Sequence, residues 1–119
     1  MSIQIAGIDT KKGLDLYDDE LDIYLVVLRS YVEHMPATLN KMRKVSAETL
    51  LDYAVAVHTV KGASANIGAE EVRQSALHLE MMAKADNLAG VLAENEKFLK
   101  RVDTLVNDIR NWLKKNGHL

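Results

Sequence analysis

The sequence predicts an all-α protein that folds as one helical bundle. Apolar residues recur at the three- and four-residue spacing of helices, whereas the alternation typical of strands is nearly absent. The 119 residues include only one proline and six glycines, so few positions interrupt a helix. This length suits a single domain, and an apolar fraction of 48% is typical of a globular protein.

The first long helical pattern follows a short N-terminal arm and a turn over residues 9–16. Acidic residues at 18–20 stand where a helix N-terminus favours negative charge. The apolar positions after them share one helical face: Leu21, Tyr24, Leu25, Leu28, Tyr31, Val32 and Met35. Pro36 is expected to open a separate short helix, because a first turn does not need its missing amide hydrogen. That helix would end in the basic stretch 41–44.

Three further helices are expected, over about residues 47–67, 69–84 and 88–116. Ser46 is placed to cap the first of them, and Gly68 to end it in a left-handed conformation.

The last helix has the clearest pattern, with Asp86 or Asn87 as its N-cap. Only Asn95 breaks an apolar seam of the kind that a bundle helix packs through: Leu88, Val91, Phe98, Val102, Leu105, Ile109 and Trp112.

Composition excludes several classes of function. With 15 basic and 17 acidic residues, the net charge of −2 does not suit nucleic-acid binding. The absence of cysteine excludes disulfides, thiol catalysis and cysteine-ligated metals. No apolar run would span a bilayer, and the N-terminus lacks the pattern of a signal peptide. We therefore expect a soluble, cytoplasmic domain.

One stripe of the helix over 47–67 is unusual. The core stripe consists of Tyr53, Val57, Val60, Ser64 and Ile67, and the unusual stripe of Leu51, Ala54, Val55, His58, Lys61, Gly62 and Ala65. A buried stripe would rarely accept both His58 and Lys61, and a solvated one would carry more charge.

Gly62 is the sharpest anomaly, because a glycine inside a helix costs about 1 kcal/mol relative to alanine. One turn after His58, it leaves space for a large group to approach the imidazole, and the Lys61 ammonium could reach an anion held there. A phosphohistidine needs a nucleophilic ring nitrogen, access and a nearby cation. Each residue alone has a simpler role, as a filler, a solvated charge or a helix contact. Together they indicate a site that handles anions.

The stretch from Ala56 to Ala69 closely resembles the signature of histidine phosphotransfer (HPt) domains. That signature is a histidine, a lysine three on, a glycine four on, small residues and a glycine ten on. Further similarity extends over nearly the whole chain, at Gly7, Ile8, Asp9, Gly13, Leu14, Tyr24, Leu28, Tyr31, Leu79, Glu80 and Lys84.

The resemblance implies an antiparallel up-and-down four-helix bundle with an additional short N-terminal helix. Residues 1–119 would form a single HPt domain, with the arm and short helix at 1–17 and the bundle at about 18–116. By this resemblance His58 is the phospho-acceptor, Lys61 the cation beside the phosphate and Gly62 the access position. Glu80 would bond the other imidazole nitrogen and fix its tautomer, and Lys84 would help near the phosphate.

The implied function is a reversible phosphorelay without ATP. His58 would accept a phosphoryl group from a receiver-domain aspartate and pass it to another receiver. The sequence agrees in having no nucleotide-binding motif, so it is not expected to be an enzyme. The chain would need no cofactor of its own, since Mg²⁺ would belong to the receiver.

The expected partners are response-regulator receiver domains and a hybrid sensor histidine kinase, with no contact to nucleic acid or membrane. The chain is expected to be a monomer, either free or as the cytoplasmic part of a membrane-bound sensor kinase. The candidate docking residues are Leu14, Leu51, Ala54, Val55 and Ala65.

Several alternatives stay open. The phosphotransfer domain of a chemotaxis-type histidine kinase shares the signature. In the dimerisation domain of a sensor kinase, the histidine is usually followed by an acidic residue and soon by a proline. That class is disfavoured, since Thr59 and Val60 follow His58 and no proline follows Pro36. A metal- or haem-binding bundle would need ligand pairs, which the four histidines do not form at i, i+4 spacing. A purely structural bundle would leave His58 dispensable.

Overall fold

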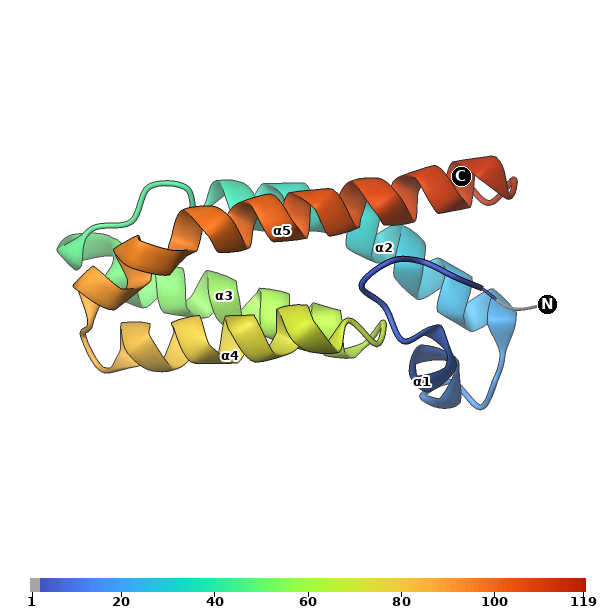
Figure 1. Cartoon of the computed structure of the whole chain (residues 1–119), viewed down its shortest axis with the longest axis horizontal. Helices are drawn as coiled ribbons and strands as arrows, with labels where there is room; N and C mark the ends of the chain where they lie inside the picture. Colours follow the sequence, from blue (N-terminus) through green and yellow to red (C-terminus); the bar gives the residue numbers. More distant parts are fainter. Residues whose placement is uncertain (1–2) are drawn as a thin grey trace.

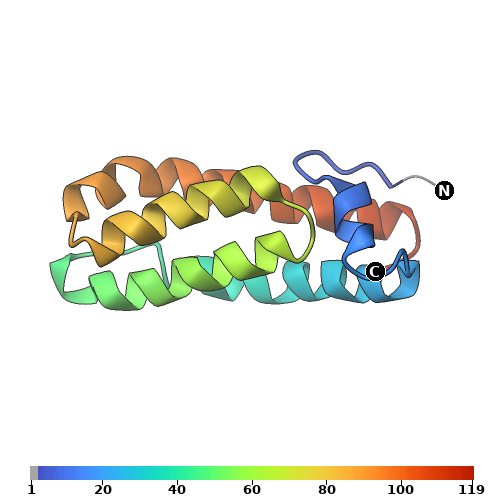
Figure 2. The ribbon, with the colours of Figure 1, turned by 90° about the horizontal axis from the view of Figure 1, so that it is seen from below.

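The structure, a computed structural model, describes residues 3–119. These residues form helices joined by turns and loops, with no strand among them. Their order is α1 (Thr10–Asp15), α2 (Leu21–Asn40), a 3₁₀ turn (Ala47–Thr49), α3 (Leu50–Ala65), α4 (Glu70–Lys84) and α5 (Leu88–Lys115). Helices α2 to α5 run alternately up and down as a four-helix bundle (Figures 1 and 2). The predicted all-α bundle with a short N-terminal helix is therefore confirmed. Residues 1 and 2 of the predicted arm lie outside the described part.

Helices α2 and α5 extend beyond the α3–α4 hairpin at one end of the bundle, where α1 and the N-terminal arm lie (Figure 1). The molecule is therefore elongated, with extents of 46 × 23 × 18 Å. Ile3 and Ile5 of the arm are buried in the core. Among residues 3–119, no helix combines the length and apolar character needed to cross a membrane.

The predicted seam of α5 lies in the core except at its half-buried ends, Leu88 and Trp112, and its polar residue has two partners. Asn95 is buried, accepts a hydrogen bond from the Tyr53 hydroxyl at 2.7 Å and donates one to the Met42 carbonyl at 2.8 Å. Since a buried amide without partners would be costly, these bonds favour one register of α5 against α3.

The expectation that Pro36 opens a new helix is wrong. Pro36 lies inside α2, which continues to Asn40. Met35 and Leu39, on either side of the proline, are both buried and continue the apolar face of the helix. Burial of that face outweighs the lost backbone hydrogen bond, which costs about 3 kcal/mol in an unsupported helix. The basic stretch 41–44 therefore follows α2.

The start of α2 also differs from the expected one. Asp18 and Asp19 adopt left-handed backbone conformations, with φ of 54° and 61°, in the turn after α1. Aspartate tolerates this region better than most residues do. α2 therefore begins at Leu21, and the acids at 18 and 19 belong to the turn rather than to the helix.

Helix α1 is fastened to the turn between α3 and α4. The amide of Asp9, the N-cap of α1, donates to the Gly68 carbonyl at 2.9 Å, and the hydroxyl of Tyr24 on α2 donates to the Ile67 carbonyl of the same turn at 2.7 Å. Gly68 has the predicted left-handed conformation, with φ of +83°, but it lies in the turn after α3, which ends at Ala65. A side chain on Gly13 would come within 2.7 Å of the Ile67 carbonyl. This glycine therefore allows α1 to lie against the end of the helix that carries His58.

Candidate functional site

His58 lies on the outer face of α3, and 63% of its side chain is exposed. The unusual stripe predicted from the sequence thus faces solvent at this position, while Tyr53, Val57, Val60 and Ser64 of the core stripe are buried. Among residues 3–119 the only hydrogen bond of the imidazole is made by Nδ1. The Nε2 side of the ring is therefore available to a reactant.

Glu80 of α4 holds the other side of the ring. Its Oε2 lies 2.7 Å from His58 Nδ1, and only 3% of the glutamate side chain is exposed. An ionised carboxylate can only accept hydrogen bonds, so Nδ1 must be the donor. In the neutral imidazole the proton therefore stays on Nδ1, and Nε2 carries the free lone pair.

Two lysines bind the same carboxylate. Lys61 donates to Glu80 Oε1 at 2.7 Å from α3, and Lys84 lies 3.1 Å from Oε2, one turn further along α4. Burial by itself would raise the pKa of Glu80, but the hydrogen bonds from Lys61, Lys84 and His58 lower it to about 2. Glu80 is therefore ionised at neutral pH, and four side chains form one charge cluster.

Gly62 leaves open space beside this cluster. A methyl group added at Gly62 would meet no atom within 4 Å. It therefore does not serve a close helix–helix contact, which was the simpler explanation of a glycine at this position.

The predicted docking residues are only partly on the surface. Leu51 and Val55 precede His58 on α3 and are 77% and 69% exposed. Ala65, also on α3, and Leu14 of α1 are half-buried. Ala54 is buried in the hydrophobic core, so its placement on the docking surface is wrong. Its position on the helix lies at the edge between the two stripes, where a small methyl group is covered by its neighbours.

The sequence indicated Glu80 and Lys84 only through resemblance, although their i, i+4 spacing on one helix is a signal of an ion pair. It did not show that Lys61 reaches across from α3 to the same carboxylate. Spacing along one helix does not report contacts between helices, and these contacts depend on how α3 and α4 pack.

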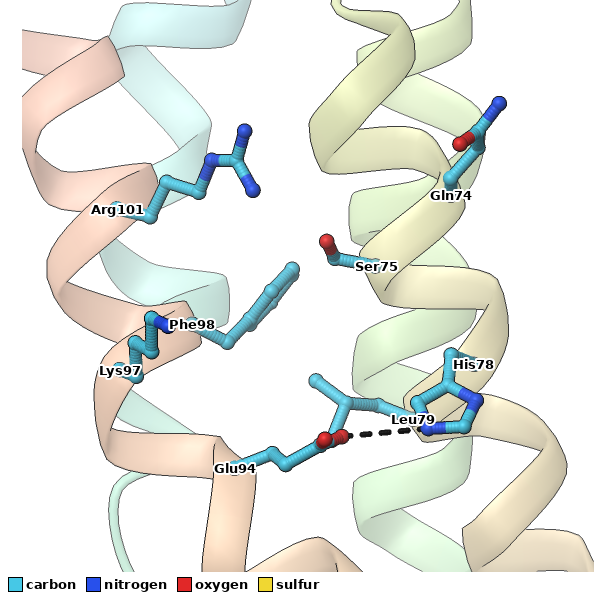
Figure 3. A pocket seen from close by; sticks show the side chains of 8 residues that line it. All are labelled: Gln74, Ser75, His78, Leu79, Glu94, Lys97, Phe98 and Arg101. Atoms are coloured by element: carbon cyan, nitrogen blue, oxygen red, sulfur yellow. Dashed lines mark ion pairs between the residues drawn. The ribbon is translucent and has the colours of Figure 1, made fainter.

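A groove of about 370 Å³ lies between α4 and α5 (Figure 3). His78 Nε2 lies 3.4 Å from Glu94 Oε2 at its edge, and Leu79 and Phe98 line it. None of the residues of the charge cluster around His58 lines this groove. Within residues 3–119, no three histidine, aspartate or glutamate side chains are grouped so as to hold a metal ion.

A helical bundle that carries a largely exposed histidine bonded to a buried carboxylate matches the class of histidine phosphotransfer modules. The sequence model described as Hpt domain matches residues 26–113, well over half of the chain. The protein therefore belongs to the Hpt domain family. Hpt domains act in the phosphorelays of two-component signalling and do not use ATP. Comparisons with curated proteins and with solved structures found no match.

Proposed function

We propose that this chain accepts a phosphoryl group on His58 Nε2 from the aspartate of one receiver domain and passes it to the aspartate of another. The observation that carries this proposal is the 2.7 Å contact of Nδ1 with buried Glu80. This contact fixes the tautomer that makes Nε2 nucleophilic, on a ring that is largely exposed.

The exchange needs no proton transfer within the domain. The Nε2 lone pair attacks phosphorus and forms the N–P bond, while the P–O bond to the aspartate breaks and its electron pair stays on the leaving carboxylate. The proton on Nδ1 stays in place, bonded to Glu80. In the second transfer an aspartate carboxylate attacks phosphorus, and the N–P electron pair returns to Nε2.

The surroundings of His58 suit such an exchange. Open space at Gly62 admits the partner's active-site loops, and the charge cluster supplies a cation near a phosphoryl group that carries negative charge in flight. Any Mg²⁺ would be bound by the acidic pocket of the receiver, so the task of this chain is to position the ring.

Docking would use the apolar surface around the ring, including Leu51, Val55 and Leu14. We expect a small, transient interface, because the carrier must leave one receiver before it meets the next. A monomer in the cytoplasm, working with a hybrid sensor histidine kinase, fits this role. A kinase domain that phosphorylates His58 directly from ATP is the alternative source of phosphate.

The test is to incubate the protein with a receiver domain that carries a radiolabelled aspartyl phosphate, and to follow acid-labile, base-stable label. The wild-type protein should take up the label, and His58→Gln should not. His78→Gln is a matched control, since His78 is similarly exposed and also lies beside a carboxylate. Equal labelling of wild type and His58→Gln, or no labelling of wild type, would refute the proposal. If only an ATP-bound kinase domain labels the protein, and a phosphorylated receiver does not, the phosphoryl donor is a kinase domain.

A further inference from the structure

We infer, on the basis of the proposed function, that the two lysines divide the work: Lys84 is the cation that binds the phosphoryl group on His58, and Lys61 is a positioning residue that holds Glu80. The contacts of the two side chains differ in three respects, although both bind the same carboxylate.

The first difference is which parts of the fold each lysine joins. Lys61 extends from α3 to Glu80 on α4, so its bond links two helices at the level of the ring. Lys84 binds Glu80 from the same helix at i, i+4 spacing. Moving Lys84 therefore breaks no contact between helices, whereas moving Lys61 does.

The second difference is burial. Lys61 is 24% exposed and Lys84 is 64% exposed, while Glu80 is almost fully covered. An ion pair with a well-solvated cation contributes less, because water competes for that cation. A buried carboxylate that loses its best-covered partner is left with an uncompensated charge. Turning Lys61 away from Glu80 would therefore destabilise the fold more than turning Lys84 away would.

The third difference is the oxygen that each lysine uses. Lys84 and His58 Nδ1 both bind Oε2, whereas Lys61 binds Oε1. The Lys84 ammonium thus shares an acceptor atom with the ring that would receive phosphate. A phosphoryl group brings up to about two negative charges. The flexible, solvated Lys84 side chain can then turn from Oε2 to the phosphoryl oxygens, while Lys61 keeps Glu80 ionised and in place.

The experiment phosphorylates the whole protein with phosphoramidate, so no receiver is needed, and follows the ³¹P signal of the phosphohistidine against pH. A bound cation lowers the pKa of the phosphoryl group. We expect Lys84→Gln to raise that pKa by about half a pH unit and Lys61→Gln to leave it near the wild-type value. Lys100→Gln is the matched control, because Lys100 forms an exposed i, i+4 pair with Glu96 at 3.5 Å on α5.

A second measurement tests the positioning role. Lys61→Gln should lower the melting temperature and allow His58 to populate both neutral tautomers, seen in the ¹⁵N shifts of its ring. Adding Glu80→Gln should restore the melting temperature, because it removes the unpaired buried charge. If Lys61→Gln folds weakly, a restored melting temperature in the double variant shows that the unpaired charge of Glu80 is the cause.

Two results would overturn the division of roles. One is a raised phosphoryl pKa in Lys61→Gln with an unchanged value in Lys84→Gln, and the other is a Lys61→Gln protein with wild-type stability and tautomer. If phosphoramidate does not modify His58 at all, the proposed function fails and this inference falls with it. Modification with wild-type behaviour of Lys84→Gln overturns this inference alone.

Discussion

At the scale of single residues, the proposed reactivity of His58 depends on Glu80. A buried carboxylate with three donors remains ionised, and its bond to Nδ1 leaves Nε2 as the only free ring nitrogen. The histidine is recognisable from the sequence by the adjacent lysine and glycine. The tautomer is not, because it depends on an atom of another helix.

Gly62 is the residue whose substitution best separates access from stability. Gly62→Ala should stabilise the fold by about 0.5–1 kcal/mol, since helical alanine is favoured over glycine and the added methyl group meets no neighbour. Urea unfolding would measure this gain. Gly62→Leu should remain helical and at least as stable as wild type, but it should slow transfer from a receiver about tenfold or more by blocking approach. Wild-type transfer rates in Gly62→Leu would contradict the access role.

At the scale of elements, the apolar faces of α2, α4 and α5 follow the helical periodicity of the sequence and were predictable. Pro36 was misinterpreted because local rules place proline at a helix start, whereas burial of Met35 and Leu39 keeps α2 continuous. The start of α2 was misplaced for a related reason, since the left-handed backbone of Asp18 and Asp19 follows from how α1 packs.

Pro36→Ala tests whether packing alone maintains α2 through the proline. The substitution supplies the missing backbone donor without altering the buried face, so the free energy of unfolding should rise by about 1–3 kcal/mol. Denaturant unfolding measures the change. Ala37→Pro, on the exposed side of the same turn, should instead lower the free energy of unfolding, because it removes a backbone donor. A loss of stability in Pro36→Ala would mean that the proline ring itself fills a needed space.

The exposed apolar residues of α3 should affect partner binding rather than chemistry. Leu51→Asp and Val55→Asp should weaken binding to a receiver about tenfold or more, as for residues near the centre of an interface. Leu92→Asp is the control, because Leu92 is 55% exposed on α5. Titration calorimetry measures binding, and modification by phosphoramidate should stay normal in all three variants. Unchanged receiver affinity in both α3 variants would place the docking surface elsewhere.

At the scale of the whole molecule, the charge cluster couples the site to the stability of the bundle. The pKa of Glu80 is lowered from 4.5 to about 2 in the folded protein. Because the folded value is the lower one, its contribution is fully present above pH 4.5 and is lost as the pH falls from 4.5 towards 2.

Glu80→Gln should therefore change the pH dependence of unfolding. Lowering the pH from 6 to 3 should reduce the unfolding free energy of the wild type more than that of Glu80→Gln. The stability of the wild type relative to the variant should therefore fall. Urea unfolding at several pH values measures it, and the comparison of two proteins cancels the titration of other carboxylates. A difference that is constant from pH 6 to 3 would show that Lys61, Lys84 and His58 do not lower the pKa of Glu80.

Identifying the phosphorylated nitrogen shows directly whether His58 carries the phosphoryl group. After phosphorylation by a labelled receiver domain, ³¹P and ¹⁵N NMR should show one phosphoryl group per chain, on Nε2 of His58, with the proton retained on Nδ1. A phosphoryl group on Nδ1, or on His34, His78 or His118 in place of His58, would contradict the account.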